Sequence, residues 1–225
     1  MGEIDIIWIY LAMLILPIIA SLNINRNYNK YKKINTKKKL SGFEVARKIL
    51  DENGLNEIYI VETQGNLTDH YDPKRKTVRL SSDIYHGESI AAASVAAHEC
   101  GHAIQDKDGY SWMKIRSAIF PIVNISNHIA YITLIVGFIL ESYDFILISV
   151  ALTAISLLFQ LVTLPVEFDA SKRAKKELGE LNLIDEEELK GSNKVLGSAA
   201  MTYVAGVLTT LLQMLYYLMA FRDRD

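Results

Sequence analysis

The chain has 225 residues, of which half are hydrophobic and 22% are charged, and its formal net charge is −2 at pH 7. A mean hydropathy of +0.15 is high for a soluble domain, and the apolar residues occur in blocks, which indicates a multi-pass membrane protein. The near-neutral charge argues against a nucleic-acid partner, and the single cysteine excludes a disulfide within the chain.

Four apolar stretches are about as long as the hydrocarbon core of a bilayer requires: residues 6–22, 117–140, 145–166 and 201–221. The first is preceded by the acidic residues Glu3 and Asp5 instead of the basic residues that open a signal peptide. It is therefore expected to stay in place as a membrane anchor.

A basic segment follows the first span. Residues 25–40 include seven Lys or Arg residues and no acid, so the positive-inside rule places this segment in the cytoplasm. Residues 23–116 and 167–200 are then inside, whereas residues 141–144 and both termini are outside. The protein is thus predicted to lie in the cell membrane, in contact with the lipid bilayer.

The inner segment from Ser41 to about Gly109 is predicted to be a small α+β unit. Ser41 and Glu44 have the spacing of a capping box, which opens a helix, and Asn53 with the glycine after it is typical of a helix end. A longer helix is expected to begin near Ser89.

Two strands are predicted between these helices. Residues 57–63 and 76–81 alternate between apolar and polar side chains, as half-buried strands do. The Gly, Asn, Asp and Pro residues within 64–75 predict turns that connect them. Two strands that lead into a helix with paired histidines are the order expected of a zincin.

The longer helix contains the sequence HECGH at residues 98–102. His98 and His102 are four residues apart, so in a helix both imidazoles lie on one face and can share a metal ion. Glu99 lies about 100° further round the helix, beside such an ion without ligating it, where a general base is needed. The alternatives are two surface histidines or a decayed site.

A zinc ion with two histidine ligands needs a third protein ligand and an open position for water. Glu167 follows the third span, where Pro165 is expected to end one helix and begin a new polar one. Asp169 is the alternative ligand, although it can instead pair with Arg173 four residues later. Cys100 is about 200° from His98 on the helix, which favours a packed thiol over a ligand.

Other polar residues are candidates for a supporting role. His70, Tyr71 and Tyr85 flank the second strand and could donate a hydrogen bond to a developing oxyanion, or serve only as turn and packing residues. His128 lies in the second span near Asn124 and Asn127, where it either lines a wet cavity or exchanges hydrogen bonds with a neighbouring helix.

Four segments resemble, in order, the YugP-like neutral zinc metallopeptidases of bacterial membranes: LTDHYDP, VRLSSDIYHG, AAHECGHAIQ and LPVEFDASKRA. The resemblance extends from residue 41 to about residue 176. It implies a membrane-bound zinc peptidase of the gluzincin type, in which His98, His102 and Glu167 bind Zn²⁺ and Glu99 is the base.

The chain is also loosely similar to the HtpX-like membrane proteases, which likewise have two spans between the HExxH sequence and a ligand glutamate. In those proteins the glutamate is commonly followed four positions later by aspartate, but Ser171 occupies that position here. The aspartate that could support the metal ligands in those proteins is therefore absent at this position.

The predicted fold is an α-helical membrane protein with about four transmembrane helices and a small cytosolic α+β zincin-like catalytic unit. The chain is predicted to begin with a transmembrane anchor (residues 1–23), followed by the cytosolic catalytic unit with the HExxH helix (24–116). A transmembrane helix pair (117–166) and a cytosolic helical segment with the third ligand (167–200) come next. The last division is a transmembrane helix with its tail (201–225).

The predicted function is that of a zinc-dependent endopeptidase that cleaves peptide bonds near the cytoplasmic membrane surface through a zinc-activated water, with Glu99 as general base and His70 and Tyr71 as further catalytic candidates. Its substrates would be membrane-associated proteins or peptides. The alternatives are an inactive membrane scaffold with a structural metal site, and a metal transporter, which would need repeated acidic or His-rich spans. No pattern in the sequence defines an oligomeric state.

Overall fold

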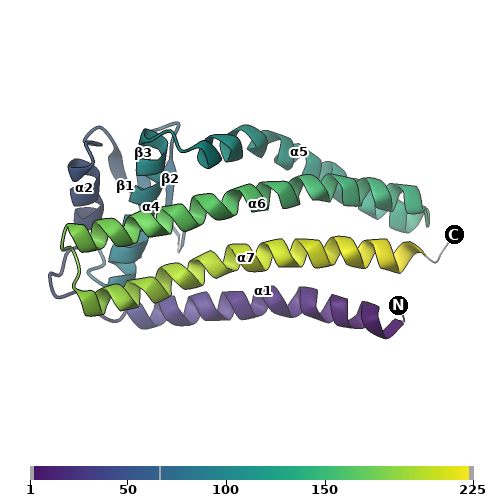
Figure 1. Cartoon of the computed structure of the whole chain (residues 1–225), viewed down its shortest axis with the longest axis horizontal. Coiled ribbons are helices and arrows are strands. Elements are labelled where there is room, and N and C mark those ends of the chain that lie inside the picture. The colour runs from purple at the N-terminus through teal and green to yellow at the C-terminus, as the bar shows by residue number, and fades with distance from the viewer. Residues whose placement is uncertain (1–2, 66, 223–225) are drawn as a thin grey trace. The chain divides into compact units, whose positions relative to one another are not determined.

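Residues 3–65 and 67–222 of the chain are described in a computed structural model, which is mainly helical (Figure 1). The elements in chain order are α1 (Glu3–Tyr31), α2 (Gly42–Glu52), β1 (Tyr59–Thr63), β2 (His70–Asp72), β3 (Thr77–Ser81), α3 (Ser82–Tyr85), α4 (Ile90–Lys107), α5 (Ser111–Ile139), α6 (Tyr143–Glu180) and α7 (Glu186–Arg222).

The residues divide into two compact units. The first unit comprises Met1–Ser21, Lys114–Pro165 and Met201–Asp225, and the second comprises Leu22–Met113 and Val166–Ala200. All four of the long helices, α1, α5, α6 and α7, contribute residues to both units.

The first unit contains the apolar parts of the helices α1, α5, α6 and α7. Each of these four helices is long and apolar enough to cross a membrane, with a mean hydropathy between 1.7 and 2.5 over its most apolar window. Only 6% of that window is buried in α1 and 33% in α7. Apolar surface exposed to this extent is typical of helices surrounded by lipid. The prediction of four candidate membrane-spanning helices is confirmed.

Hydrogen bonds between side chains connect the helices of the first unit. The amide Nε2 of Gln160 in α6 donates to Thr210 Oγ1 in α7 at 2.9 Å, and Ser156 in α6 donates to Asn127 in α5. Such bonds hold membrane helices together. His128 is exposed, and its Nδ1 lies 2.7 Å from the carbonyl oxygen of Asn124 one turn earlier.

The expected helix break at Pro165 is wrong, because α6 continues through this residue to Glu180. A proline removes its own N–H donor, and neighbouring residues keep the remaining helical hydrogen bonds; prolines are tolerated in this way within membrane helices. Residues on both sides of the predicted division at residue 200 belong to one helix, α7. The sequence boundaries at residues 23, 166 and 200 therefore fall inside helices.

The second unit is built around a three-stranded sheet with the order β1-β3-β2. Strand β3 is central and mostly buried; it pairs parallel with β1, from Tyr59 opposite Thr77, and antiparallel with β2, from His70 opposite Arg79. The sequence predicted β1 and β3 within one or two residues but placed β2 in a turn, which is wrong. Three residues are too few for a strand pattern, and only pairing with β3 defines this strand.

Helices α2 and α4 pack against one another and share the core of the second unit with β3. The predicted capping box opens α2: Ser41 Oγ accepts from the Glu44 N–H at 3.3 Å, and a Glu44 carboxylate oxygen accepts from the Ser41 N–H at 2.8 Å. Alanines on α4 allow close packing, and the fully buried members of the core include Val45, Ala46, Ile49, Leu50, Val78, Leu80, Ala92, Ala96 and Ala97.

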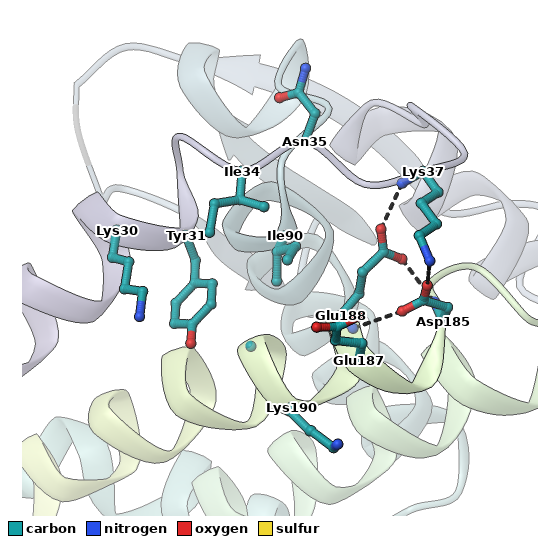
Figure 2. Close-up of a pocket in the computed structure, with 11 residues that line it drawn as sticks. Lys30, Tyr31, Ile34, Asn35, Lys37, Ile90, Asp185, Glu187, Glu188 and Lys190 are labelled. Atoms are coloured by element: carbon teal, nitrogen blue, oxygen red, sulfur yellow. Dashed lines mark hydrogen bonds and ion pairs between the residues drawn. The ribbon is translucent and has the colours of Figure 1, made fainter.

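A pocket of about 470 Å³ lies between the end of α1, the loop after it and the start of α7 (Figure 2). Its acidic residues hold the loop against α7. One carboxylate oxygen of Glu188 accepts from the Lys37 N–H at 2.6 Å, the other accepts from the Asp185 N–H at 2.8 Å, and the Lys37 ammonium pairs with Asp185. These carboxylates are therefore engaged in local structural contacts.

Candidate metal centre

Helix α4 positions the two histidines of the HExxH sequence. It begins where the sequence predicts, because Ser89 caps it and its Oγ accepts from the Ala92 N–H at 3.1 Å. The helix is continuous through Lys107, so His98 and His102 lie one turn apart, with ring centroids separated by 4.8 Å. The predicted shared face of the two imidazoles is present.

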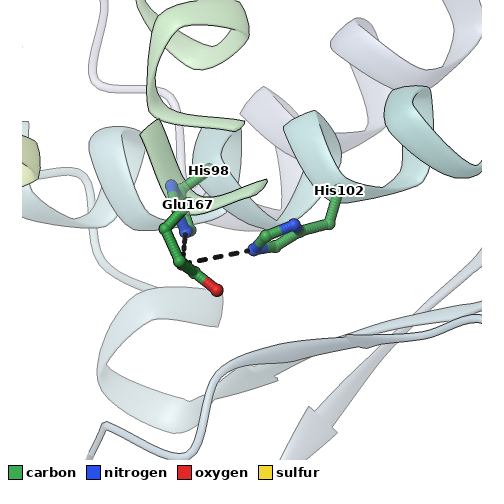
Figure 3. A group of neighbouring side chains, drawn as sticks. All are labelled: His98, His102 and Glu167. Carbon is green, nitrogen blue, oxygen red and sulfur yellow. Dashed lines mark hydrogen bonds and ion pairs between the residues drawn. The ribbon is translucent and has the colours of Figure 1, made fainter. Parts of the chain in front are cut away.

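Glu167 of α6 points at both imidazoles (Figure 3). Its Oε2 lies 3.3 Å from His98 Nε2 and 3.7 Å from His102 Nε2. The ligand atoms of these three residues all lie within 4.8 Å of one another, and no other group of this kind occurs among the described residues. The Glu167 side chain is 3% exposed and those of His98 and His102 are 15% and 9% exposed, so the group is sheltered from bulk water.

The donor set fits zinc. Two imidazole nitrogens and one carboxylate oxygen are the donors that zinc binds readily, and three protein ligands leave a fourth position open, as in catalytic rather than structural sites. Burial alone would lower the pKa of His102, but its contact with Glu167 and the negative charges of Glu99 and Glu167 raise it. Metal binding at these nitrogens would compete with protons.

Gly101 allows α6 to come close enough to α4 for Glu167 to reach the histidines. A Cβ atom at this position would lie 2.5 Å from the carbonyl oxygen of Ala170, well inside van der Waals contact. The atom that it would meet belongs to the backbone of α6, which cannot rotate aside as a flexible side chain can, and Ala170 is fully buried. The glycine inside the motif thus determines the separation of the ligand-bearing helices.

Glu99 is buried on the same helix but does not belong to the ligand group. Burial raises the pKa of its carboxyl, while the neighbouring imidazoles of His98 and His102 act in the opposite direction. The carboxyl of Glu99 therefore lies within electrostatic reach of both imidazoles.

Other side chains contact the candidate ligands. Ser171 Oγ lies 3.2 Å from His98 Nδ1, so the serine that stands where HtpX-like proteins commonly have aspartate still contacts a ligand. Gln105 Oε1 lies 3.0 Å from His102 Nδ1. Asp169, the alternative third ligand, lies outside the ligand group; it accepts from Gln105 and from Arg173. Sequence reasoning did not single out Gln105.

The other candidates have different surroundings. The Tyr71 hydroxyl donates to Asp106 Oδ2 at 2.8 Å, and burial with this carboxylate raises the pKa of the hydroxyl. His70 is exposed, with its Nδ1 2.8 Å from the Thr68 carbonyl oxygen. Tyr85 packs on Phe43 at a centroid distance of 5.1 Å. The described contacts thus place none of the three among the ligands.

Cys100 lies in the core on another face of α4. Its thiol is fully buried 3.6 Å from the carbonyl oxygen of Ala46, and burial raises the pKa of the thiol. A packed, protonated thiol fits the expectation for this residue, because a zinc ligand would have to be a thiolate.

Comparisons with known proteins agree with this site. Residues 6–222 match the family described as "Putative neutral zinc metallopeptidase". The chain is 42% identical over 215 residues to "Putative membrane protease YugP" of Bacillus subtilis (strain 168), and the match covers 96% of each chain. No solved structure matches.

Proposed function

The chain belongs to the neutral zinc metallopeptidase family, and we propose that it is a membrane-embedded endopeptidase in which His98, His102 and Glu167 bind zinc and Glu99 is the general base. The observation that carries this proposal is the convergence of three ligand atoms from α4 and α6 within 4.8 Å, near the buried carboxyl of Glu99.

Each residue has a defined task in the proposed hydrolysis. When bound, zinc supplies Lewis acidity, which polarises the scissile carbonyl and makes water nucleophilic near neutral pH. Glu99 accepts the proton of the attacking water and transfers it to the nitrogen of the leaving amine. His98, His102 and Glu167 would hold the zinc and thereby fix where the substrate carbonyl is attacked, and little of their side-chain surface is exposed.

His70 and Tyr71 are retained as candidates for stabilising the oxyanion. Both belong to β2, which lies at an edge of the sheet and packs on α4. Tyr71 donates its only hydroxyl hydrogen to Asp106 and would have to exchange this partner to serve an oxyanion. The ring of His70 is exposed, but its Nδ1 lies 2.8 Å from the Thr68 carbonyl oxygen, so a neutral imidazole would likewise have to exchange this partner.

The proposal is tested by removing the metal. Hydrolysis of casein by the detergent-purified protein should fall to background after treatment with a chelator and return when one equivalent of zinc is added. The family cofactor supports this expectation. Activity that persists in the chelated, metal-free protein would contradict a zinc peptidase, and a zinc-loaded chain that cleaves neither casein nor membrane-protein substrates would favour the scaffold alternative.

We further propose that the site faces the cytoplasm, so that membrane-associated proteins or peptides are its substrates. The support is the basic segment after the first span, because basic loops stay inside. With a membrane-impermeant maleimide, Glu141→Cys should label in intact cells, whereas Lys38→Cys should label only after lysis. The native Cys100 is buried and should give little background. The reverse labelling pattern would overturn this orientation.

A further inference from the structure

Gln105 is a fully buried amide on α4, three residues after His102. Its side-chain oxygen Oε1 lies 3.0 Å from His102 Nδ1. Its nitrogen Nε2 lies 2.8 Å from the carbonyl oxygen of Val166 and 2.9 Å from Asp169 Oδ2, both on α6. One side chain therefore contacts a candidate zinc ligand and the helix that carries another, Glu167.

The surroundings fix which end of the amide faces His102. A carbonyl oxygen and a carboxylate only accept hydrogen bonds, so the NH₂ group of Gln105 must face Val166 and Asp169 and donates both hydrogens there. The amide oxygen then faces His102. Because this oxygen can only accept, the hydrogen between the two side chains belongs to His102 Nδ1.

Arg173 holds the carboxylate of Asp169 in place. Its Nε donates to Asp169 Oδ2 at 2.6 Å, and its Nη1 donates to Asp108 Oδ2 at 2.6 Å, just after the end of α4. Asp108, Arg173, Asp169, Gln105 and His102 thus form a chain of hydrogen bonds that runs from α4 to α6 and back. Each donor in this chain meets an acceptor, which leaves Gln105 one orientation.

We propose that Gln105 is a positioning residue that keeps the hydrogen of His102 on Nδ1 and leaves Nε2 as the metal-binding nitrogen, with Asp169 and Arg173 acting through it. This inference rests on the proposed zinc site. Partners of this kind orient ligand imidazoles in metal sites, and their loss typically lowers metal affinity by about 10- to 100-fold. Here the partner is a neutral amide whose direction is determined by the same helix that provides Glu167.

The first test is a competition for zinc between the purified protein and a fluorescent chelator. Gln105→Leu should weaken zinc binding by about 10- to 100-fold. Asn53→Leu is the matched control, because the Asn53 amide also donates to a carboxylate of α6, Glu177 at 2.9 Å, but away from the ligands. Both variants should lower the unfolding temperature of the metal-free protein, and only the first should weaken zinc binding. Equal zinc affinities in the two variants would overturn the proposal.

The second test does not need zinc. In metal-free protein labelled with ¹⁵N-histidine at alkaline pH, where imidazoles are neutral, the His102 signal should show hydrogen on Nδ1. The signal is assigned by its absence in His102→Ala. In Gln105→Leu it should shift toward the Nε2–H form, whereas in Asn53→Leu it should not change. An Nε2–H form in the native protein would refute the role of Gln105, whereas native protein with the Nδ1–H form that fails to bind zinc would refute the proposed function instead.

Discussion

Replacing Glu99 by glutamine is expected to abolish peptide hydrolysis while the protein keeps about one zinc per chain. The glutamine has nearly the same shape and is not needed as a ligand, but its amide cannot accept the proton of the attacking water. General bases contribute about 100- to 10,000-fold to turnover, so kcat on casein should fall by at least about 100-fold. Zinc content and casein hydrolysis, measured on the same sample, check this expectation.

The control for that variant is Glu52→Gln, which changes an exposed carboxyl at the end of α2. It should retain both zinc and activity. If Glu99→Gln hydrolysed casein at the native rate, Glu99 would not be the base. If it lost zinc and unfolded at a much lower temperature, its carboxylate would be a structural group, an outcome that contradicts both the general-base role and the scaffold alternative.

Replacing Glu167 by alanine is expected to cost most of the zinc affinity. The substitution removes the one anionic donor of the ligand group and leaves two imidazoles on a single helix. The loss should exceed the roughly 100-fold that supporting side chains can account for. Chelator competition measures the affinity, and hydrolysis of casein should disappear with the metal.

Glu177→Ala is the matched control for Glu167→Ala, since Glu177 lies on the same helix and bonds Asn53 instead of a ligand histidine. Its zinc affinity should equal that of the native protein. Zinc binding of native strength in Glu167→Ala would show that the third ligand is another residue, and Asp169 would be the next candidate to replace.

The sequence predicted the parts of this site that depend on periodicity within one helix. The spacing of His98 and His102 places both on one face of any regular helix, and Ser89 marks the start of that helix. The assignment of Glu167 needed more, because α6 had to return beside α4. It rested on charge after an apolar span and on the resemblance to known peptidases.

Contacts that depend on the packing of α6 against α4 could not be predicted. The distance from Ser171 to His98 and the orientation of Gln105 follow from the rotation of α6, which no local pattern encodes. Gly101 illustrates the difficulty: in sequence it is one residue of HECGH, but in the structure its missing side chain allows the backbone of Ala170 to approach. The strand β2 was missed for a similar reason, since pairing with β3 defines it.

X-ray absorption at the zinc edge of the purified, zinc-loaded protein tests the central claim most directly. The account predicts one zinc per chain, surrounded only by nitrogen and oxygen at about 2.0 to 2.2 Å, with the outer-shell scattering of two imidazoles. Any zinc that Glu167→Ala retains should have one protein oxygen ligand fewer. A sulfur neighbour at about 2.3 Å, a single imidazole, or a spectrum unchanged in Glu167→Ala would contradict a site made by His98, His102 and Glu167.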